Sequence, residues 1–310
     1  MSKRNNVGSL TYQVQQRYQS MLATGRDRHQ DKQNGVSHRY IYGWSTYRTY
    51  TKHANYFAQY CKEEHGCRTL EECRQYVPEW FATRKHLSAP TQKLEATALV
   101  KLYGSSYEQL EIRPDRAERH TITRSRLPAE RDKHFSEKNH AELVEFCRSV
   151  GCRRSELQRL PGTAMQERDG KLYLHIKGKG GKWRWAPVTG DSELVRRICT
   201  AAGSGRVIEQ MTRNGKVPEA MDTHSYRADY AARVYLQHAR PLEDLQGVRE
   251  HYGRYNRDGS KRLQPALYVM RGDRSGEMYD RKAMITTSKA LGHNRESVVA
   301  DHYLYSIYHS

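Results

Sequence analysis

Residues 291–306 of this chain read LGHNRESVVADHYLYS, and they place a histidine, His293, ten positions before a tyrosine, Tyr303. Three upstream clusters carry further polar side chains, in this order: Arg153 in GCRRSEL, Lys179 in GKGGK, and His224 with Arg227 in HSYR. Together the four motifs supply a nucleophile, cations that can bind a phosphate and groups that can transfer a proton. These are the groups needed to transfer a phosphodiester without a metal.

The net charge of the chain favours a nucleic acid as partner. Among 310 residues, 53 Lys and Arg stand against 35 Asp and Glu, a formal charge of +18. A polyanion suits this surplus because neutralised phosphates release their condensed counterions. No apolar run is long enough to span a membrane and the start has no signal-peptide pattern, so we expect a cytoplasmic, nucleoid-associated protein without a membrane partner.

The six cysteines do not indicate a disulfide scaffold in a chain of this length. Cys61, His65, Cys67 and Cys73 lie near one another, but they lack the close C-x2-4-C pairs of structural zinc sites. Cys61 and Cys73 also fall at apolar positions of predicted helices. We therefore expect no metal and no cofactor.

The predicted fold class is mainly α with a small β-sheet (α+β), in two domains. After a polar stretch, 1–8, that we expect to be disordered, residues 9–112 favour an all-helical domain of about four helices. Apolar spacing and a Thr69/Glu72 capping box predict its helices over residues 9–23, 45–64, 69–81 and 90–103. Pro78 should kink or shorten the third of them.

Residues 113–133 are rich in arginine and contain two prolines, so we interpret them as a basic linker between the domains. We expect four of the arginines to follow a DNA backbone: Arg116, Arg119, Arg124 and Arg126. The alternative is an ordinary solvated charged loop.

Residues 134–310 favour a mixed, mainly helical second domain. Alternating apolar residues on both sides of a glycine turn indicate a β-hairpin over 171–188. Helical spacing predicts an amphipathic helix that Gly151 ends, and then further helices over 190–202, 223–238, 280–290 and 296–306. A Gly-, Arg- and Asp-rich insert near 240–278 shows no such pattern.

The arginines of these motifs suit a phosphate. His224 and Arg227 are three positions apart on a predicted helix, so both project from one face. A guanidinium group makes two charge-assisted bonds to a phosphate and stays charged. Arg153 starts a short helix, where Glu156 could orient it and where Arg154 is the alternative phosphate ligand.

Lys179 lies in the glycine turn of the predicted hairpin, where the backbone can bend sharply and approach DNA closely. A lysine at such a tip can donate a proton to a leaving 5′ oxygen. Lys182 and Arg184 are further candidates for contacts to the DNA backbone.

Tyr303 is the predicted nucleophile, with Tyr305 and Tyr308 as alternatives. A phenol ordinarily ionises near pH ~10, so at neutral pH its attack needs nearby cations and a proton acceptor. Two arginines around the phosphate would supply the charge stabilisation that a metal supplies in other enzymes.

In this order and spacing, the four motifs resemble those of the tyrosine recombinase (phage integrase) family, over about residues 136–306. They are arginine in G-x-R-x-S-E-L, lysine in a G-K-G-x-K hairpin, H-x-x-R, and L-G-H followed by tyrosine. The resemblance implies that Arg153 and Arg227 clamp the scissile phosphate and that His293 hydrogen-bonds it. It also implies two proton-transfer groups: Lys179 protonates the leaving 5′ oxygen, and His224 transfers a proton. Tyr303 would then form a covalent 3′-phosphotyrosine.

The resemblance also implies a biological setting. The first domain would be the family's core-binding domain, double-stranded DNA the substrate, and a homo-tetramer on DNA the active assembly. The expected function is then site-specific recombination without a metal or ATP, for integration or excision of a mobile element. Two alternatives remain at this stage: a type IB topoisomerase-like enzyme, and a DNA-binding regulator without cleavage activity.

Two features depart from the family's pattern. Arg227 is followed by Ala-Asp-Tyr rather than by His-Ser/Thr-Phe, and 66 positions separate it from His293 because of the insert. Within or beside that insert, Arg271 or Arg274 could take a place near the phosphate.

Overall fold

The structure is a computed structural model that describes residues 8–117, 135–293 and 295–309. The contacts divide the chain into two compact units, Met1–Glu118 (unit 1) and Arg119–Ser310 (unit 2). Of the predicted linker arginines, Arg116 is exposed, whereas Arg119, Arg124 and Arg126 lie outside the described residues, as does the N-terminal stretch 1–7. Within the described part of the chain, no helix is long and apolar enough to cross a bilayer.

Unit 1 is all helical, and its helices are α1 (Leu10–Gln19), α2 (Arg28–Gln33), α3 (Trp44–His65), α4 (Leu70–Cys73), α5 (Val77–Thr83) and α6 (Ala89–Tyr103). Thr69 caps α4 by accepting a hydrogen bond from the Glu72 amide, and α3 ends at Gly66 in the left-handed conformation. Pro78 falls in the first turn of α5, where it needs no amide partner, so it starts a new helix and does not kink one.

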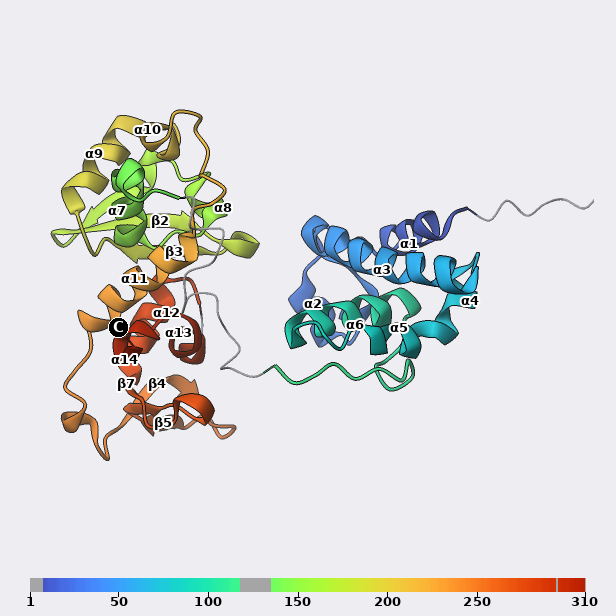
Figure 1. Ribbon diagram of the computed structural model, residues 1–310. Coiled ribbons are helices and arrows are strands. Elements are labelled where there is room, and N and C mark those ends of the chain that lie inside the picture. The colour runs from blue at the N-terminus through green and yellow to red at the C-terminus, as the bar shows by residue number, and fades with distance from the viewer. Residues whose placement is uncertain (1–7, 118–134, 294, 310) are drawn as a thin grey trace, which may run out of the picture. The chain divides into compact units, whose positions relative to one another are not determined.

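Unit 2 is mixed, with these elements (Figure 1): α7 (Ala141–Val150), α8 (Arg154–Leu157), β1 (Met165–Arg168), β2 (Lys171–Lys177), β3 (Trp183–Pro187), α9 (Ser192–Ala202), α10 (Ile208–Met211), α11 (Thr223–Leu236), β4 (Arg249–Tyr255), β5 (Lys261–Pro265), β6 (Leu267–Val269), β7 (Met278–Asp280), α12 (Arg281–Ala290), α13 (Glu296–His302) and α14 (Ser306–His309). The predicted fold class, mainly α with a small β-sheet, is confirmed.

The predicted hairpin forms β2 and β3, and β1 adds a third antiparallel strand in the order β1-β2-β3. Successive side chains of β2 point to opposite faces of the sheet. Leu172, Leu174 and Ile176 enter the core, and His175 lies on the opposite, outer face. The sheet therefore anchors the hairpin tip beside the end of α7 and the start of α8.

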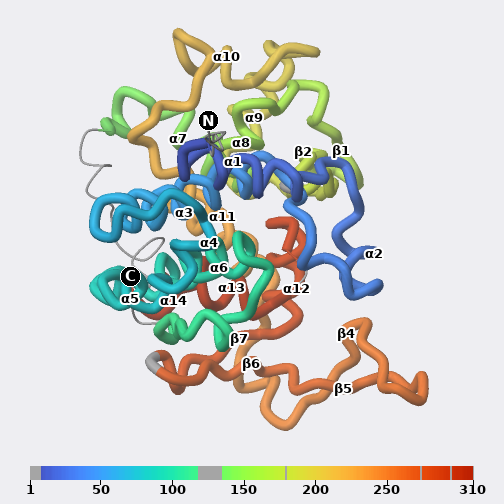
Figure 2. The backbone as a smooth tube through the Cα atoms, turned by 90° about the vertical axis from the view of Figure 1, so that its right-hand side faces the viewer, coloured from blue at the N-terminus to red at the C-terminus, as the bar shows by residue number. Residues whose placement is uncertain are grey.

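Helix α11 packs on α7 and α12 and places Arg227 in the middle of unit 2. The insert after α11, for which the sequence indicated no elements, folds into the antiparallel pairs β4–β5 and β6–β7. Arg240, at the start of the insert, forms ion pairs with Glu250 in β4 (2.7 Å) and with Asp280 at the end of β7 (2.8 Å). The β4–β5 hairpin lies at the end of unit 2 opposite α9 and α10 (Figures 1 and 2).

Candidate active site

Arg227 is fully buried, at 0% exposure, and reaches from α11 to three other segments. Its guanidinium group donates hydrogen bonds to the carbonyl oxygens of Gly151 and Leu291, and its Nε lies 3.4 Å from the hydroxyl of Tyr303. Burial, and then the nearby arginine Arg184, lower the pKa of Arg227 to about 10. The side chain therefore stays a cation at neutral pH, in a site shielded from water.

Glu156 is the carboxylate that holds the arginines in place. Its oxygens accept hydrogen bonds from Arg153 Nη1 (2.5 Å), the Arg153 amide (3.0 Å) and Arg184 Nη2 (2.9 Å), and lie 3.9 Å from Arg227 Nη1. Burial by itself would raise the pKa of Glu156, but Arg184, the Arg153 amide and Arg227 together hold that pKa at about 2. One carboxylate among three guanidinium groups leaves a site that is net positive.

Arg153 is the arginine of this cluster that faces outward, because it caps α8 and its side chain is partly exposed. Its Nη2 donates to Nε2 of His293 at 3.3 Å. The alternative residue, Arg154, donates instead to the carbonyl oxygens of Val217 (3.1 Å) and Pro218 (2.7 Å) and fixes the loop before α11. Of the two, Arg153 is therefore the one whose guanidinium group belongs to the cluster with Glu156 and His293.

His293 follows α12 and lies between Arg153 and Tyr303. Its amide donates to the carbonyl of Ser288 at 2.7 Å, and its ring centroid is 5.8 Å from that of Tyr303. Burial, followed by the charges of Arg227 and Arg153, lowers the pKa of His293 to about 4. The imidazole is therefore neutral at pH 7 and can both donate and accept a hydrogen bond.

Of the three C-terminal tyrosines, Tyr303 has its hydroxyl against Arg227. It comes directly after α13, is only 5% exposed and lies with its ring 5.6 Å from the Arg227 guanidinium carbon. Tyr305 stacks on His309 at 4.2 Å between ring centroids, and Tyr308 bonds to the backbone of Met278. The geometry thus favours Tyr303 over both alternatives.

The other two sequence-predicted groups lie on neighbouring elements. His224 sits one turn before Arg227 on α11, partly buried, and its amide donates to Asp222 at 2.9 Å. Lys179 lies at the hairpin tip, where Gly180 (φ 75°) and Gly181 (φ 78°) need the left-handed conformation that glycine adopts without strain. The side chain of Lys179 is outside what the structure describes.

Arg184 was predicted to contact DNA, and that prediction is wrong. Its side chain is buried, and it donates to Glu156 and to the carbonyls of Gly151 (3.2 Å) and Ala290 (2.5 Å). The strand alternation could have revealed this, because Arg184 lies on the same face of β3 as the buried Ala186. Lys182, by contrast, is exposed beside the hairpin tip.

Arg274 does not join the cluster either. Its guanidinium is buried and bonds Glu277, the hydroxyl of Tyr279 (2.5 Å) and the carbonyl of Ala300 (2.6 Å), so it supports α13. Arg271 is exposed. Arg153 contacts His293, and Arg227 contacts Tyr303.

Comparisons with known proteins agree with this fold. No family model matches the chain, and no curated protein sequence matches it. The XerH site-specific recombinase, solved bound to palindromic difH substrate as a post-cleavage complex, aligns with 97% of this chain and 92% of its own, at 14% identity and a TM-score of 0.50. The Tn1549 transposon integrase, solved with transposon right end DNA, covers 94% of each chain at 10% identity and a TM-score of 0.41.

The likeness to the XerH structure establishes the fold alone. The resemblance to the tyrosine recombinases, which the sequence motifs predicted, is confirmed at that level by the XerH structure. Which reaction this chain carries out is a separate question, and it depends on the cluster around Arg227.

Proposed function

We propose that this protein is a site-specific DNA recombinase that cuts and rejoins DNA through a covalent 3′-phosphotyrosine at Tyr303. The observation that carries the proposal is the approach of Arg227 Nε to the Tyr303 hydroxyl, at 3.4 Å, inside a net positive cluster. Arg153 and His293 complete that cluster from two other segments.

The first step is phosphate binding. Arg153 and Arg227 donate hydrogen bonds to the non-bridging oxygens of the scissile phosphate, and the neutral His293 adds a third bond. Glu156 orients Arg153 before DNA arrives. Arg227 is fully buried and its donors are bonded to Gly151, Leu291 and Tyr303, so DNA binding has to free at least one of these donors for the phosphate. This arrangement takes the place of a metal ion in neutralising the transition state.

The second step is attack. The Tyr303 oxygen forms a bond to phosphorus while the bond from phosphorus to the 5′ oxygen breaks, and Lys179 supplies the proton that the leaving oxygen takes up. The phenolic proton passes to His224 directly or through water. Since the phosphoester is conserved as a tyrosyl ester, a 5′ hydroxyl can attack it in reverse and no ATP is consumed.

The proposed substrate is double-stranded DNA and the proposed active assembly is a homo-tetramer that exchanges strands between two duplexes, as in integration or excision of a mobile element. A type IB topoisomerase-like enzyme would share the chemistry but act as a monomer. Recombination of two duplexes that requires the tetramer distinguishes the two.

A nicked-duplex trapping assay in EDTA tests the chemistry. A pool of nicked duplexes with a random central sequence is incubated with protein, and adducts that survive denaturation are isolated and sequenced to give the site. We expect adducts with wild type and with Tyr305→Phe and none with Tyr303→Phe, which keeps the ring but lacks the hydroxyl. Adduct formation by Tyr303→Phe, or an absolute need for magnesium, contradicts the proposal.

A further inference from the structure

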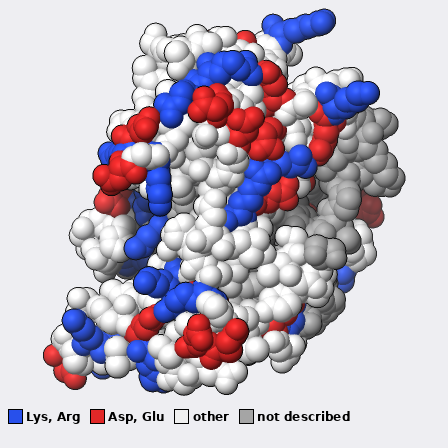
Figure 3. Space-filling view, turned by 90° about the vertical axis from the view of Figure 1, so that its left-hand side faces the viewer, with Lys and Arg blue, Asp and Glu red and all other residues white. Residues whose placement is uncertain are grey.

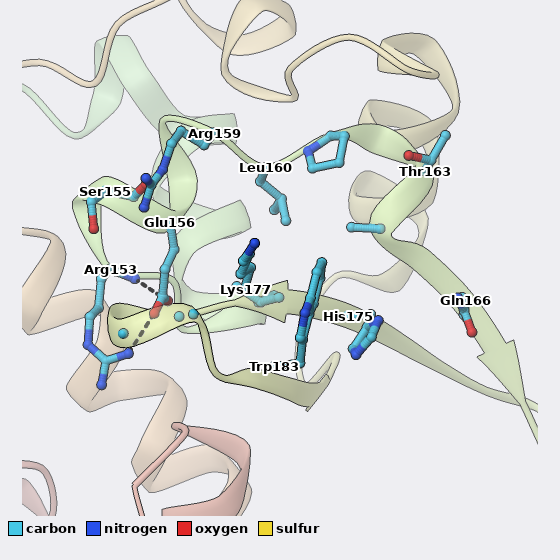
Figure 4. Close-up of a pocket in the computed structure, with 16 residues that line it drawn as sticks. Arg153, Ser155, Glu156, Arg159, Leu160, Thr163, Gln166, His175, Lys177 and Trp183 are labelled. Carbon is cyan, nitrogen blue, oxygen red and sulfur yellow. Dashed lines mark hydrogen bonds and ion pairs between the residues drawn. The ribbon is translucent and has the colours of Figure 1, made fainter. Parts of the chain in front are cut away.

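A cavity of about 720 Å³ begins at Arg153 and Glu156 and extends along the β2–β3 hairpin to Trp183 and His175 (Figure 4). The reaction described above uses only its Arg153 end. Ligand pockets typically measure roughly 300–1,000 Å³, so the rest of the cavity has room for a nucleotide.

A stack of rings forms one wall of this cavity on the outer face of the sheet. His175 is sandwiched between two tryptophans, with centroids 4.4 Å from Trp183 and 4.1 Å from Trp185. The Arg168 guanidinium carbon lies 3.5 Å from the Trp185 ring centre and closes the far end. The stack ends in Trp183, whose ring packs against His175. Trp183 is nevertheless 58% exposed. A rigid, exposed aromatic ring is the platform on which a nucleobase stacks.

The charge of the cavity selects an anion. Lys177 and Arg159 line it together with Arg153, and Nζ of Lys177 lies 5.7 Å from the Trp183 ring centre. Among the described residues that line it, Glu156 is the only carboxylate, and it is already bonded to Arg153 and to Arg184. Cations beside an exposed tryptophan fit the phosphate and the base of one nucleotide. The exposed Thr163 and Gln166 offer hydrogen bonds to a base edge.

We propose that this cavity binds an unpaired nucleotide of single-stranded DNA, with its base stacked on Trp183 and its phosphate near Lys177 and Arg159. That this nucleotide comes from the cleaved strand rests on the proposed function. Lys179, at the tip of the same hairpin, is assigned to the leaving 5′ oxygen, so the released 5′ end lies closest to the cavity. Holding that end unpaired would delay rejoining to its own strand and favour transfer to a partner strand.

Direct binding to the full-length protein tests the inference. The probes are an oligothymidylate of about eight nucleotides and an all-abasic oligonucleotide of the same length, which keeps the phosphates but lacks the bases. We expect Trp183→Ala to weaken oligothymidylate binding by about tenfold, Trp183→Phe to retain most of it, and neither change to affect the abasic probe. Because Trp183 is exposed, both variants should melt like wild type.

Two results would overturn the inference. The first is that Trp183→Ala binds oligothymidylate as tightly as wild type does, which would indicate a protein segment as the occupant of the cavity. The second is that Trp183→Ala loses as much affinity for the abasic probe as for oligothymidylate. Neither measurement involves cleavage. If Trp183-dependent binding occurs but no Tyr303 adduct is ever trapped, the proposed function fails alone. If the adduct forms but oligothymidylate binding does not depend on Trp183, only this inference fails.

Discussion

At the residue scale, Glu156 determines how much positive charge the site presents. Three arginines converge on this buried carboxylate from α8, β3 and α11. A carboxylate whose pKa is held at about 2 stays ionised throughout the neutral range, so it orients the three guanidinium groups and offsets one of their charges, which leaves the site net positive. The arginines are therefore held in place before any ligand binds.

His293 gives a prediction about pH. Its pKa in the folded protein, about 4, is below the ordinary value of 6.5, mainly because the ring is buried and next to arginines. The unfolded chain therefore binds the proton first, and the stability that this histidine contributes is present above about pH 6.5 and lost as the pH falls towards 4. We expect wild type to lose about 1 kcal/mol more unfolding free energy than His293→Gln between about pH 7 and pH 5, because solvent screens this partly exposed ring and reduces the full effect of the shift.

Denaturant unfolding of both proteins at the two pH values measures this difference. An identical pH response in wild type and His293→Gln would show that the ring is not held neutral by burial and by Arg153 and Arg227.

At the same scale, the sequence distinguished some residues better than others. The motif context favoured Arg153 over Arg154, and in the structure Arg154 donates to the carbonyls of Val217 and Pro218, whereas Arg153 contacts His293. The catalytic role of Arg153 stays a prediction. It failed for Arg184, because a basic residue near a hairpin tip was interpreted from its charge and not from the face of the strand on which it lies.

At the scale of elements, the turn from α7 to α8 positions the cluster. Gly151 ends α7 with φ 59°, and its carbonyl accepts hydrogen bonds from both Arg227 and Arg184. A Cβ on this residue would lie 2.2 Å from the Tyr230 ring, and Tyr230 is itself buried on α11. The site therefore depends on a glycine here for two separate reasons.

Gly151→Ala should accordingly destabilise the protein by about 2–4 kcal/mol, from left-handed backbone strain and from a clash with Tyr230. Gly66→Ala is the matched control, because Gly66 also ends a helix with φ 63°, but a Cβ added there would meet no described atom within 4 Å. We expect about 1–2 kcal/mol for that change. Thermal or denaturant unfolding compares the two, and equal losses would contradict the clash.

Elements with regular apolar spacing were predictable, and the insert was not. The helices α3, α6, α11 and α12 and the β2–β3 hairpin all follow periodic burial that the sequence displays. Strands β4 and β5 are mostly exposed, and even Leu263 and Tyr255 are 49% and 60% exposed. An ion pair between Arg254 and Glu296 (3.0 Å) joins β4 to α13, and such a contact between distant segments cannot be predicted from a local sequence pattern.

At the scale of the whole molecule, net charge indicated the class of partner but not the surface that meets it. The face in Figure 3 carries basic and acidic side chains side by side and not one continuous basic area. Some exposed arginines are paired with carboxylates, as Arg197 is with Glu142 (2.5 Å). The net charge alone does not show which arginines are paired in this way. The composition could therefore predict a nucleic acid, whereas the binding face depends on the fold.

The candidate site also depends on the fold of unit 2 as a whole. Arg153 and His293 are 140 positions apart, yet their side chains are within 3.3 Å. Periodicity cannot bring such distant segments together. The family resemblance predicted that they would meet, and the fold places Arg153, Arg227, His293 and Tyr303 in one cluster.

The most direct test of the central claim is the chemical identity of the protein–DNA link. Adducts trapped in EDTA are digested with protease and nuclease, and the modified peptide is fragmented by mass spectrometry. We predict a 3′-linked nucleotide on the tyrosine of the 296–306 segment that corresponds to Tyr303, and no nucleotide on Tyr305 or Tyr308. A nucleotide on either of those tyrosines, on a serine or through a 5′ phosphate would contradict the account.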